Sequence, residues 1–380
     1  MLVVSAGPFR KRPTMVIKNW GNRPWTIDYR AKAHDLPQSV DFAIVGGGFT
    51  GLAAAAWLKR LAPQRSVALL EAGHFGDGAS GHTGGMALAE SAVGDLPGLG
   101  DVLAGYRKIL AELEVDAKLR LPGVYELGRT KPLANSPIRW NDSGQLAAVR
   151  QVPGGTINPG KVVSGLAAAA ENAGVLLFEN AELQSCDFGT PFRLNTARGV
   201  LQANHALLAT NAFVFELTGW TERAESCFTI AVATAELSDS VRDAIGVGDG
   251  KPFYTVDLPY LWGRLLGKQI VFGSGLVHFS DWHEVYALDI ARGEAAELFV
   301  RLERRIRALH PALTNVNFTH RWGGPICITA GWKPIFERHP RSENAIVLGG
   351  FSGHGVAQSV YLGAWAAEAL LWKRNLPNWK

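Results

Sequence analysis

Residues 41–72 read DFAIVGGGFTGLAAAAWLKRLAPQRSVALLEA and carry the strongest structural signal of the chain. The pattern G-x-G-x-x-G falls on Gly46, Gly48 and Gly51, and Glu71 follows the last of these glycines by twenty residues. This spacing is typical of a strand–helix–strand unit that binds a dinucleotide. A plain glycine-rich turn is the alternative for the pattern alone, and the acid at the expected distance disfavours it.

The residues around the glycines predict the elements that such a unit needs. Residues 41–45 are apolar and strand-like, residues 52–61 are rich in Ala and Leu and predict a helix, and residues 66–70 predict a second strand. The glycines allow the tight turn, the close approach of a pyrophosphate and the packing of helix on strand. The helix N-terminus offers unpaired N–H groups to the phosphates. Glu71 can accept hydrogen bonds from an adenosine ribose, which argues against the 2′-phosphate of NADP.

The composition is that of an ordinary globular protein. The chain has 380 residues, 47% hydrophobic and 19% charged, with a net charge of +4. This length predicts two intertwined lobes, and the mild charge does not suggest nucleic acid. The three cysteines form no C-x-x-C pair, no run of eighteen apolar residues predicts a membrane span, and MLVVSAGPFRKRP has the wrong order for a secretory signal. We therefore expect a cytoplasmic protein, and the oligomeric state stays open.

A second glycine cluster lies about 300 residues further on. Gly349, Gly350, Gly353 and Gly355 stand between an apolar run, 345–348, and a predicted helix. A nicotinamide enzyme has no need of this second turn. A flavin enzyme does, because FAD is held at both ends and the flavin ring needs backbone donors with a helix dipole behind them. A simple glycine cap and turn is the alternative.

Five segments together resemble a known family. They are IVGGGFTGLAAAAWL (44–58), ASGHTGG (79–85), GGTINPGKVVSGLAAAA (154–170), LLATNAF (207–213) and GGFSGHGVAQS (349–359). In order and spacing they resemble the FAD-dependent D-amino-acid oxidase-like superfamily, in its sarcosine oxidase, glycine oxidase and γ-glutamylputrescine oxidase branch. The resemblance covers roughly residues 19–375.

The resemblance implies an α/β fold in which a Rossmann-like FAD-binding domain is interleaved with an antiparallel-sheet substrate domain. The pattern change near residue 226, where short β-rich runs begin, agrees with a second lobe. We expect these divisions: an N-terminal arm, 1–37; the FAD-binding domain, 38–90, 150–215 and 325–380; and the substrate domain, 91–149 and 216–324. Trp20 and Trp25 would be unusual in a disordered tail, so the arm is expected to dock on the body. Trp25 covering the active-site mouth is one reading, and surface docking alone is the favoured alternative.

The resemblance also implies which residues hold FAD. The matching positions form four groups. The first is the pyrophosphate turn with the ribose ligand, and the second is the loop that wraps the phosphates and flavin. The third contains the adenine and pyrophosphate contacts of later strands, and the fourth is the flavin-side turn. In that order the positions are Gly46, Gly48, Phe49, Thr50, Gly51, Glu71 and Ala72; Ala79, Ser80, Gly81, His82, Gly84, Gly85 and Met86; Leu183, Thr210 and Asn211; and Gly350, Gly353, His354, Gly355 and Val356.

Three departures from the family pattern carry predictions. His82 and Thr83 replace an Arg-Asn pair of the wrapping loop, which makes a charge near the phosphates conditional on pH. Gly324 stands where sarcosine oxidases attach flavin through a cysteine, and Cys327 is three residues away, so non-covalent FAD is expected. Ala357 and Gly331 replace the substrate-binding lysine and a related acid, which disfavours sarcosine itself.

Three residues are candidates for the chemistry. His354 in the flavin-side turn suits tuning of the flavin or proton handling, and a loop-ordering hydrogen bond is the alternative. Arg264 on a predicted strand of the second lobe suits a bidentate clamp for a carboxylate or phosphonate, and a solvated strand residue is the alternative. Lys333 lies in a loop expected to face the flavin. No metal is invoked, because His283 and Glu284 lack ligand spacing.

The expected reaction is oxidation of a carbon–nitrogen bond in a small, possibly anionic amine or amino acid, such as an N-methyl amino acid or an aminophosphonate. The resemblance implies hydride transfer to flavin N5, an imine that hydrolyses, and O2 as the acceptor that gives hydrogen peroxide. A dehydrogenase that passes electrons to a quinone or protein carrier is one alternative. A non-catalytic flavin-binding partner protein is another.

Overall fold

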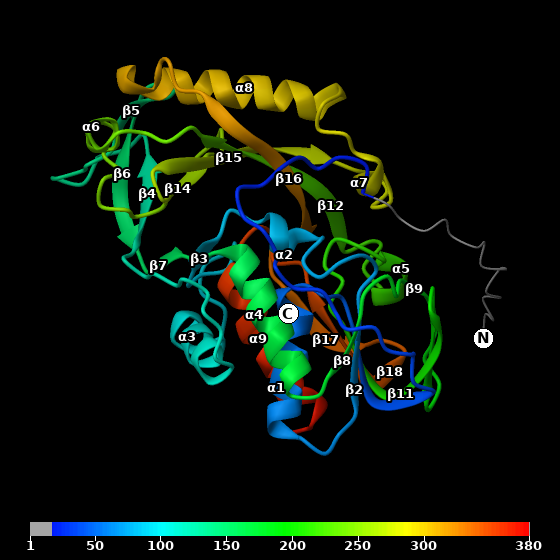
Figure 1. The fold of residues 1–380 in the computed structure, drawn as a ribbon. Coiled ribbons are helices and arrows are strands. Elements are labelled where there is room, and N and C mark those ends of the chain that lie inside the picture. Colours follow the sequence, from blue (N-terminus) through cyan, green and yellow to red (C-terminus); the bar gives the residue numbers. More distant parts are fainter. Residues whose placement is uncertain (1–16, 380) are drawn as a thin grey trace.

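The computed structural model describes residues 17–379, in which two large sheets lie in separate halves of the molecule. Figure 1 shows one sheet with helix α8 above it and the other with helices α1, α4 and α9 beside it. The chain crosses between the halves several times, so each half is assembled from distant segments. No helix within residues 17–379 has the length and apolar character needed to span a bilayer.

The first sheet is mainly parallel. Its strands run in the order β17-β18-β11-β1-β2-β8, with β10 and β9 continuing from β11. β1 pairs in parallel with β2 and β11, β2 with β8, and β11 with β18. The bounds are β1 (Ser39–Val45), β2 (Val67–Leu70), β8 (Leu176–Phe178), β9 (Leu183–Asp187), β10 (Phe192–Thr196), β11 (Gly199–Leu208), β17 (Ile335–His339) and β18 (Ser342–Gly349).

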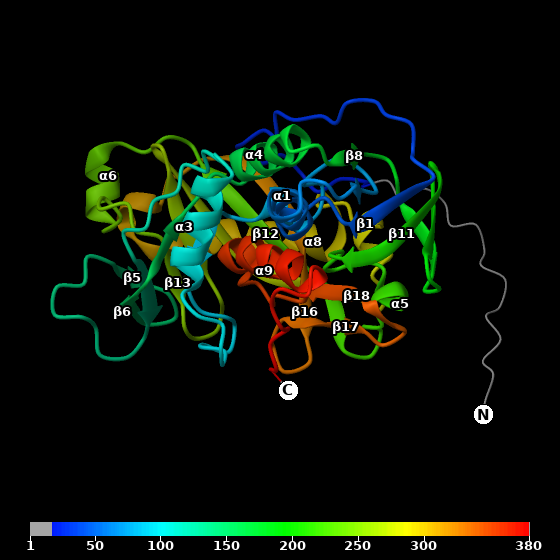
Figure 2. The ribbon, with the colours of Figure 1, turned by 90° about the horizontal axis from the view of Figure 1, so that it is seen from below.

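Helices pack on one face of this sheet. Figure 2 shows α1 (Phe49–Leu61), α4 (Pro159–Asn172) and α9 (Gly355–Leu370) side by side, with α3 (Val102–Glu112) next to α9. Residues 49–58 of α1 are all buried, which suits a helix that is apolar on every side. Gly51 lets α1 approach β1, because a Cβ there would lie 1.9 Å from the carbonyl oxygen of Gly46.

The second sheet is largely antiparallel, in the order β16-β12-β15-β14-β13-β4-β6-β5. α8 (Gly293–Leu309) covers it with an apolar stripe that includes Phe299, Leu302 and Ile306. The other bounds are β4 (Val124–Gly128), β5 (Arg139–Asn141), β6 (Gln145–Val152), β12 (Ala224–Thr234), β13 (Phe253–Thr255), β14 (Trp262–Leu266), β15 (Gln269–His278), β16 (Phe318–Thr329), α5 (Phe215–Thr218), α6 (Asp239–Ala244), α7 (Glu284–Ala287) and the 3₁₀ turn Pro311–Leu313.

A short junction and an extended segment connect the halves. β3 (Met86–Leu88) pairs with β7 (Gly154–Thr156), and the short helix α2 (Ala79–His82) contacts β16. Residues 17–37 run as an extended segment in which Trp20 and Trp25 are buried. The Trp25 indole Nε1 donates to the carbonyl of Gly81 at 2.8 Å. The other residues of the expected arm, 1–16, lie outside the described part of the chain.

The expected fold class, α/β with an antiparallel second sheet, is confirmed. The sequence predicts a helix from Asp101 to Leu119 with loops around it, but α3 ends at Glu112 and Glu114 adopts a left-handed conformation. Residues 120–156 contain the strands β4 to β7. β4 and β7 have partners that are remote in sequence, β13 and β3, so the local sequence is a weak signal for them, whereas β5 and β6 form a local hairpin.

Candidate functional site

A cavity of about 1460 Å³ lies between the two halves. One end is lined by the Gly46–Thr50 turn and by Glu71 at the carboxyl edge of the parallel sheet. The other end is lined by side chains of the second sheet, among them Thr229 and Tyr254, and by Tyr260 of the loop between β13 and β14. Crevices outside the carboxyl ends of parallel strands are where open α/β sheets bind ligands.

Two long helices begin at this cavity without a side-chain cap. The N-cap residues are Gly48 for α1 and His354 for α9, and neither first turn contains an acidic side chain. The Ser80 hydroxyl takes up the N–H of Phe49, but the positive dipole ends of both helices and their other first-turn N–H groups can favour negative or hydrogen-bond-accepting groups in the cavity. Two such ends facing one cavity suit a long ligand that presents acceptors at both places.

Glu71 lies at the end of β2, under the first turn. Its carboxylate accepts hydrogen bonds from the backbone N–H of Gly47 at 2.6 Å and of Gly73 at 2.9 Å. Burial raises the pKa of Glu71 to about 7, although these two N–H groups oppose the shift. The carboxylate is thus fixed in place and balanced between its charged and neutral forms near neutral pH.

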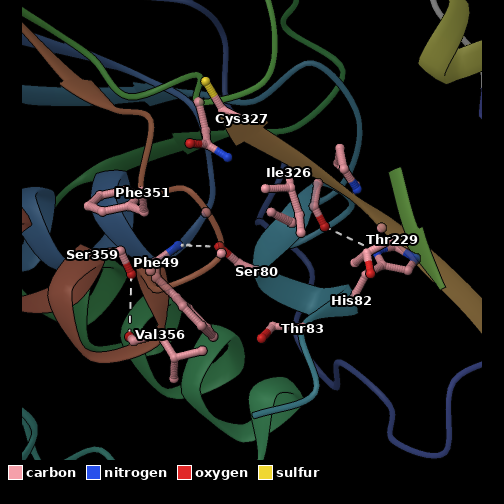
Figure 3. Close-up of a pocket in the computed structure, with 18 of the residues that line it drawn as sticks. Phe49, Ser80, His82, Thr83, Thr229, Ile326, Cys327, Phe351, Val356 and Ser359 are labelled. Carbon is pink, nitrogen blue, oxygen red and sulfur yellow. Dashed lines mark hydrogen bonds between the residues drawn. The ribbon is translucent and has the colours of Figure 1, made fainter. Parts of the chain in front are cut away.

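The loop that carries α2 lies over the start of α1. The Ser80 hydroxyl accepts the N–H of Phe49 at 2.9 Å, as Figure 3 shows. His82 lies on the same short helix, where its Nε2 meets Nη1 of Arg23 at 3.0 Å and its Nδ1 meets the carbonyl of Gly78 at 2.9 Å. Arginine only donates, so the ring proton is assigned to Nδ1.

His82 is uncharged at neutral pH. Burial lowers its pKa to about 3, and the neighbouring Arg23 acts in the same direction. The pH-dependent charge that the sequence predicted for His82 is therefore absent over the ordinary pH range. Its ring packs edge-on against Trp20 of the extended segment, with centroids 5.3 Å apart.

The second glycine turn has a strongly constrained backbone. Gly350, Ser352 and Gly353 all have positive φ, at 68°, 48° and 87°. The N–H of Gly350 donates to the side-chain oxygen of Asn211 at 3.0 Å, which ties the turn to the end of β11. His354 follows, and burial lowers its pKa, so the ring is neutral near pH 7. Its Nδ1 lies 3.3 Å from the carbonyl of Ser352, which assigns the ring proton to Nδ1 and leaves Nε2 as an acceptor.

Most residues predicted from sequence to hold a cofactor line this cavity. They are Gly46, Gly48, Phe49, Thr50, Glu71, Ala72, Ala79, Ser80, His82, Gly84, Met86, Leu183, Thr210, Asn211, Gly353, His354, Gly355 and Val356. Four glycines of the prediction, Gly51, Gly81, Gly85 and Gly350, lie behind the lining. They serve the backbone instead: a Cβ on Gly81, for example, would lie 2.2 Å from the Gly76 carbonyl oxygen.

Two of the predicted catalytic residues do not line the cavity. The Arg264 side chain is buried, its Nε donates to the carbonyl of Gly84, and its Nη2 has no partner among the described residues. Burial lowers the pKa of Arg264 to about 10, which still leaves it charged. Lys333 donates from Nζ to the carbonyl of Trp379 at 3.2 Å. Of the three catalytic candidates, only His354 is placed on the cavity wall.

Several lining residues were not singled out from the sequence. Glu90, Thr229 and Trp262 belong to none of the quoted motifs, and Ser359 ends the last motif without being singled out. Trp262 packs against the chain at Gly84, where a Cβ would come 2.0 Å from its ring. The need for a glycine at position 84 therefore comes from a tryptophan 178 positions later, a relation that only the folded structure reveals.

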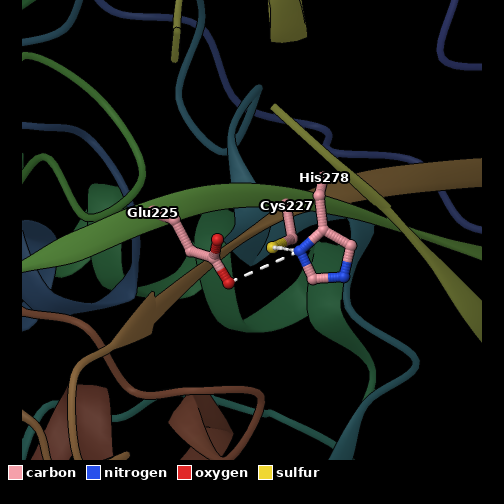
Figure 4. Close-up of side chains that lie close together, drawn as sticks. All are labelled: Glu225, Cys227 and His278. Carbon is pink, nitrogen blue, oxygen red and sulfur yellow. Dashed lines mark hydrogen bonds and ion pairs between the residues drawn. The ribbon is translucent and has the colours of Figure 1, made fainter. Parts of the chain in front are cut away.

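A cluster outside the cavity lining joins β12 to β15. Figure 4 shows Glu225, Cys227 and His278 together. His278 Nδ1 lies 3.3 Å from Cys227 Sγ and 3.4 Å from Glu225 Oε1. Burial and the adjacent Glu225 raise the pKa of the Cys227 thiol to about 12, so the thiol remains protonated and can donate to the ring. The cluster links two paired strands at the sheet surface.

Comparisons with known proteins agree with this geometry. The family model described as FAD dependent oxidoreductase matches residues 41–369. A probable oxidoreductase, OrdL, of Rhizobium meliloti is 26% identical over 92% of this chain and 87% of its own length. The γ-glutamylputrescine oxidoreductase of Escherichia coli is 25% identical over 87% of this chain and 83% of its own. The glycine oxidase structure from Geobacillus kaustophilus superposes with a TM-score of 0.71 at 20% identity, covering 89% of this chain and 96% of that one.

Proposed function

Because the chain belongs to the FAD-dependent oxidoreductase family, we propose that it oxidises the carbon–nitrogen bond of a small primary or secondary amine. Its cofactor is FAD. In the proposed reaction the amine becomes an imine that hydrolyses, and O2 receives the two electrons and leaves as hydrogen peroxide. The observation that carries this proposal is the cavity itself, which continues past the second helix N-terminus into a space walled by the second sheet.

The proposed contacts with FAD follow the length of the cavity. The Gly46–Gly51 turn and the start of α1 would hold the pyrophosphate, because an uncapped helix N-terminus there presents N–H groups. Glu71 would accept the adenosine ribose hydroxyls. The turn at Gly353 and the start of α9 would face the flavin, where backbone donors stabilise the negative charge that develops on reduction.

Bound FAD supplies the electron acceptor, since its flavin takes up the electron pair that leaves the carbon beside the substrate nitrogen. The residues of the chain position the amine and exclude water. Trp262, Trp322 and Phe351 provide an apolar wall, in which a neutral amine is favoured over an ammonium ion. His354 offers an unprotonated Nε2, so it can hold a proton that the substrate nitrogen releases.

Anaerobic flavin bleaching tests the proposal. Purified yellow protein is mixed under argon with N-methyl amino acids, D-amino acids, γ-glutamyl polyamines, aminophosphonates and simple amines, and the flavin absorbance is followed. We expect at least one amine to bleach the flavin, and admission of air to restore the colour with release of peroxide. Protein that binds no FAD would contradict the proposal.

Slow reoxidation by air would favour the dehydrogenase alternative, in which a quinone or protein carrier accepts the electrons. Failure of every amine to bleach bound flavin would favour a flavin-binding partner protein.

We also propose that FAD is held without a covalent bond. Gly324 packs against His82 and carries no nucleophile. Cys327 lines the cavity, but burial raises the pKa of its thiol, which disfavours the reactive thiolate. Precipitation of the yellow protein with acid is therefore expected to leave the flavin in the supernatant. Flavin that stays with the pellet after washing contradicts non-covalent binding and leaves the oxidation proposal intact.

A further inference from the structure

Among the described residues, the charged side chain that lines the substrate end of the cavity is a carboxylate, Glu90. Within residues 17–379, neither lysine nor arginine lines the cavity. Glu90, which follows β3, does line it, and its charge adds to burial and to Glu126 in raising the pKa of the Tyr254 phenol. The lining carboxylates Glu71 and Asp77 lie at the nucleotide end of the cavity.

The nearby cations, Arg150 and Arg264, do not line the cavity. Arg150 forms two hydrogen bonds with Glu126, through Nε to Oε2 at 2.5 Å and through Nη2 to Oε1 at 2.7 Å. Tyr254 donates to the same Glu126 at 2.6 Å. Glu90 also acts on Arg150, but that guanidinium is already matched by Glu126, so the three charged groups together leave one net negative charge. Arg264 is also charged and lies behind the lining, where its Nε donates to the carbonyl of Gly84 and its Nη2 has no partner among the described residues.

The remaining wall and the rim are apolar and aromatic. Trp262 and Tyr254 line the interior. Val256, Leu258 and Tyr260, on the loop between β13 and β14, and Trp332 also line the cavity, and they are among the most exposed large apolar side chains of the described chain, at 55%, 84%, 42% and 49%. An exposed apolar cluster at a cavity marks a binding surface. Tyrosine and tryptophan faces also attract cations.

We propose, as a refinement that rests on the amine oxidation above, that the substrate carries a second positively charged nitrogen and no carboxylate beside the reacting carbon. This is the diamine or polyamine class. The Glu90 carboxylate would accept a charge-assisted hydrogen bond from the distal ammonium group, while the hydrocarbon chain lies along Tyr254 and Trp262. A substrate carboxylate would be desolvated here without a cationic partner, which is costly. The geometry thus points away from the anionic substrates that the Arg264 hypothesis favoured.

Three amines with five carbons each test this proposal on the holoenzyme. They are 1,5-diaminopentane, pentylamine and 5-aminopentanoate, in which the carbon at the far end carries an ammonium group, is a methyl group or is a carboxylate. Anaerobic stopped-flow bleaching gives the half-saturating concentration and the limiting rate for each. We expect the diamine to saturate at the lowest concentration and the carboxylate at the highest. N-methylglycine serves as the amino-acid reference.

Glu90→Gln assigns the effect to one side chain. In this variant the half-saturating concentration of the diamine is expected to rise by about tenfold or more, with the limiting rate little changed, because one charge-assisted contact is lost. The value for pentylamine should remain within about twofold, since no charged contact is removed. Glu297→Gln, on the exposed face of α8 far from the lining, is the matched control and should behave like the parent protein.

Two results overturn the inference at different levels. If 5-aminopentanoate or N-methylglycine saturates the flavin reaction at a lower concentration than the diamine, or if Glu90→Gln weakens all three amines equally, the substrate class is wrong and amine oxidation stands. If FAD is bound and none of these amines nor the wider panel bleaches it, amine oxidation itself fails.

Discussion

At the scale of single residues, two opposing effects act on the pKa of the Glu71 carboxyl group. Burial favours its neutral form, while the N–H groups of Gly47 and Gly73 favour the charged form, and the resulting pKa is about 7. Ribose hydroxyls would add further donors to the charged form. Binding of FAD is therefore expected to lower the pKa of this group and to be coupled to proton release.

The sign of this coupling gives a pH prediction. The carboxyl group of Glu71 is charged above its pKa of about 7, and this charge is lost as the pH falls through that value. FAD affinity is then greatest above pH 7 and weakens by up to about tenfold for each pH unit below it. Flavin fluorescence quenching between pH 5.5 and 8.5 measures this dependence. Glu71→Gln, which cannot ionise, should bind more weakly at pH 8 and show a flat profile over the same range. A parent profile as flat as that of the variant contradicts the role given to Glu71.

At the scale of elements, two glycines of one turn have separable functions. Gly51 sits inside α1, where a Cβ would lie 1.9 Å from the Gly46 carbonyl oxygen, a backbone atom that cannot move aside. Gly48 has a φ of −87°, which any residue adopts, and a Cβ there would meet only the Ser80 hydroxyl, at 2.8 Å. Gly51 therefore serves the packing of helix on strand, and Gly48 keeps space at the cavity wall.

Alanine at each position tests this division. Gly51→Ala is expected to lower the stability of the apoprotein by about 1–3 kcal/mol, the usual cost of overpacking. Gly48→Ala should leave apoprotein stability nearly unchanged and weaken FAD binding by at least about tenfold, since it fills the space through which a phosphate approaches. Thermal unfolding without FAD and titration with FAD give the two readouts. Equal losses of apoprotein stability in both variants would show that the division is wrong.

The elements also show what the sequence can and cannot predict. The first strand–helix–strand unit was predictable because its signals are local: glycines at fixed spacing, an alanine-rich helix and an acid twenty residues on. The strands β4 and β7 were not, because each is short and has a partner that is remote in sequence, and the local hairpin of β5 and β6 was missed as well. Arg264 was rightly placed on a strand, but its partner, the Gly84 carbonyl, lies 180 positions away, so its commitment to the backbone was invisible.

At the scale of the whole molecule, the extended segment 17–37 joins the two halves. The N–H of Gly323 donates to the carbonyl of Trp20, and the Trp25 indole donates to Gly81 beside the cavity. Trp25 also packs edge-on against Trp322, with centroids 5.4 Å apart. Trp20 lines the cavity and Trp25 does not, so the segment closes part of the wall through Trp20. The sequence allows a cover formed by Trp25 and favours surface docking for it.

Truncation of Trp25 should therefore loosen both halves together. Trp25→Ala is expected to cost about 3–5 kcal/mol, as for other buried tryptophans. Trp372→Ala, at a side chain that is 61% exposed, is the control and should cost far less. Thermal unfolding of the two variants gives the comparison. A Trp25 variant as stable as the control would mean that the segment rests on the surface without holding the halves.

The two helix N-termini that face the cavity come from opposite parts of the chain, at residues 49 and 355. Because a ribosome delivers the earlier residues first, the Gly46–Gly51 turn can form long before the turn at Gly353 has been synthesised. If these turns hold the two ends of FAD as proposed, a nascent chain that lacks α9 offers contacts for the adenosine half alone. The proposed contacts therefore place secure binding of FAD late in biogenesis, after α9 has been synthesised.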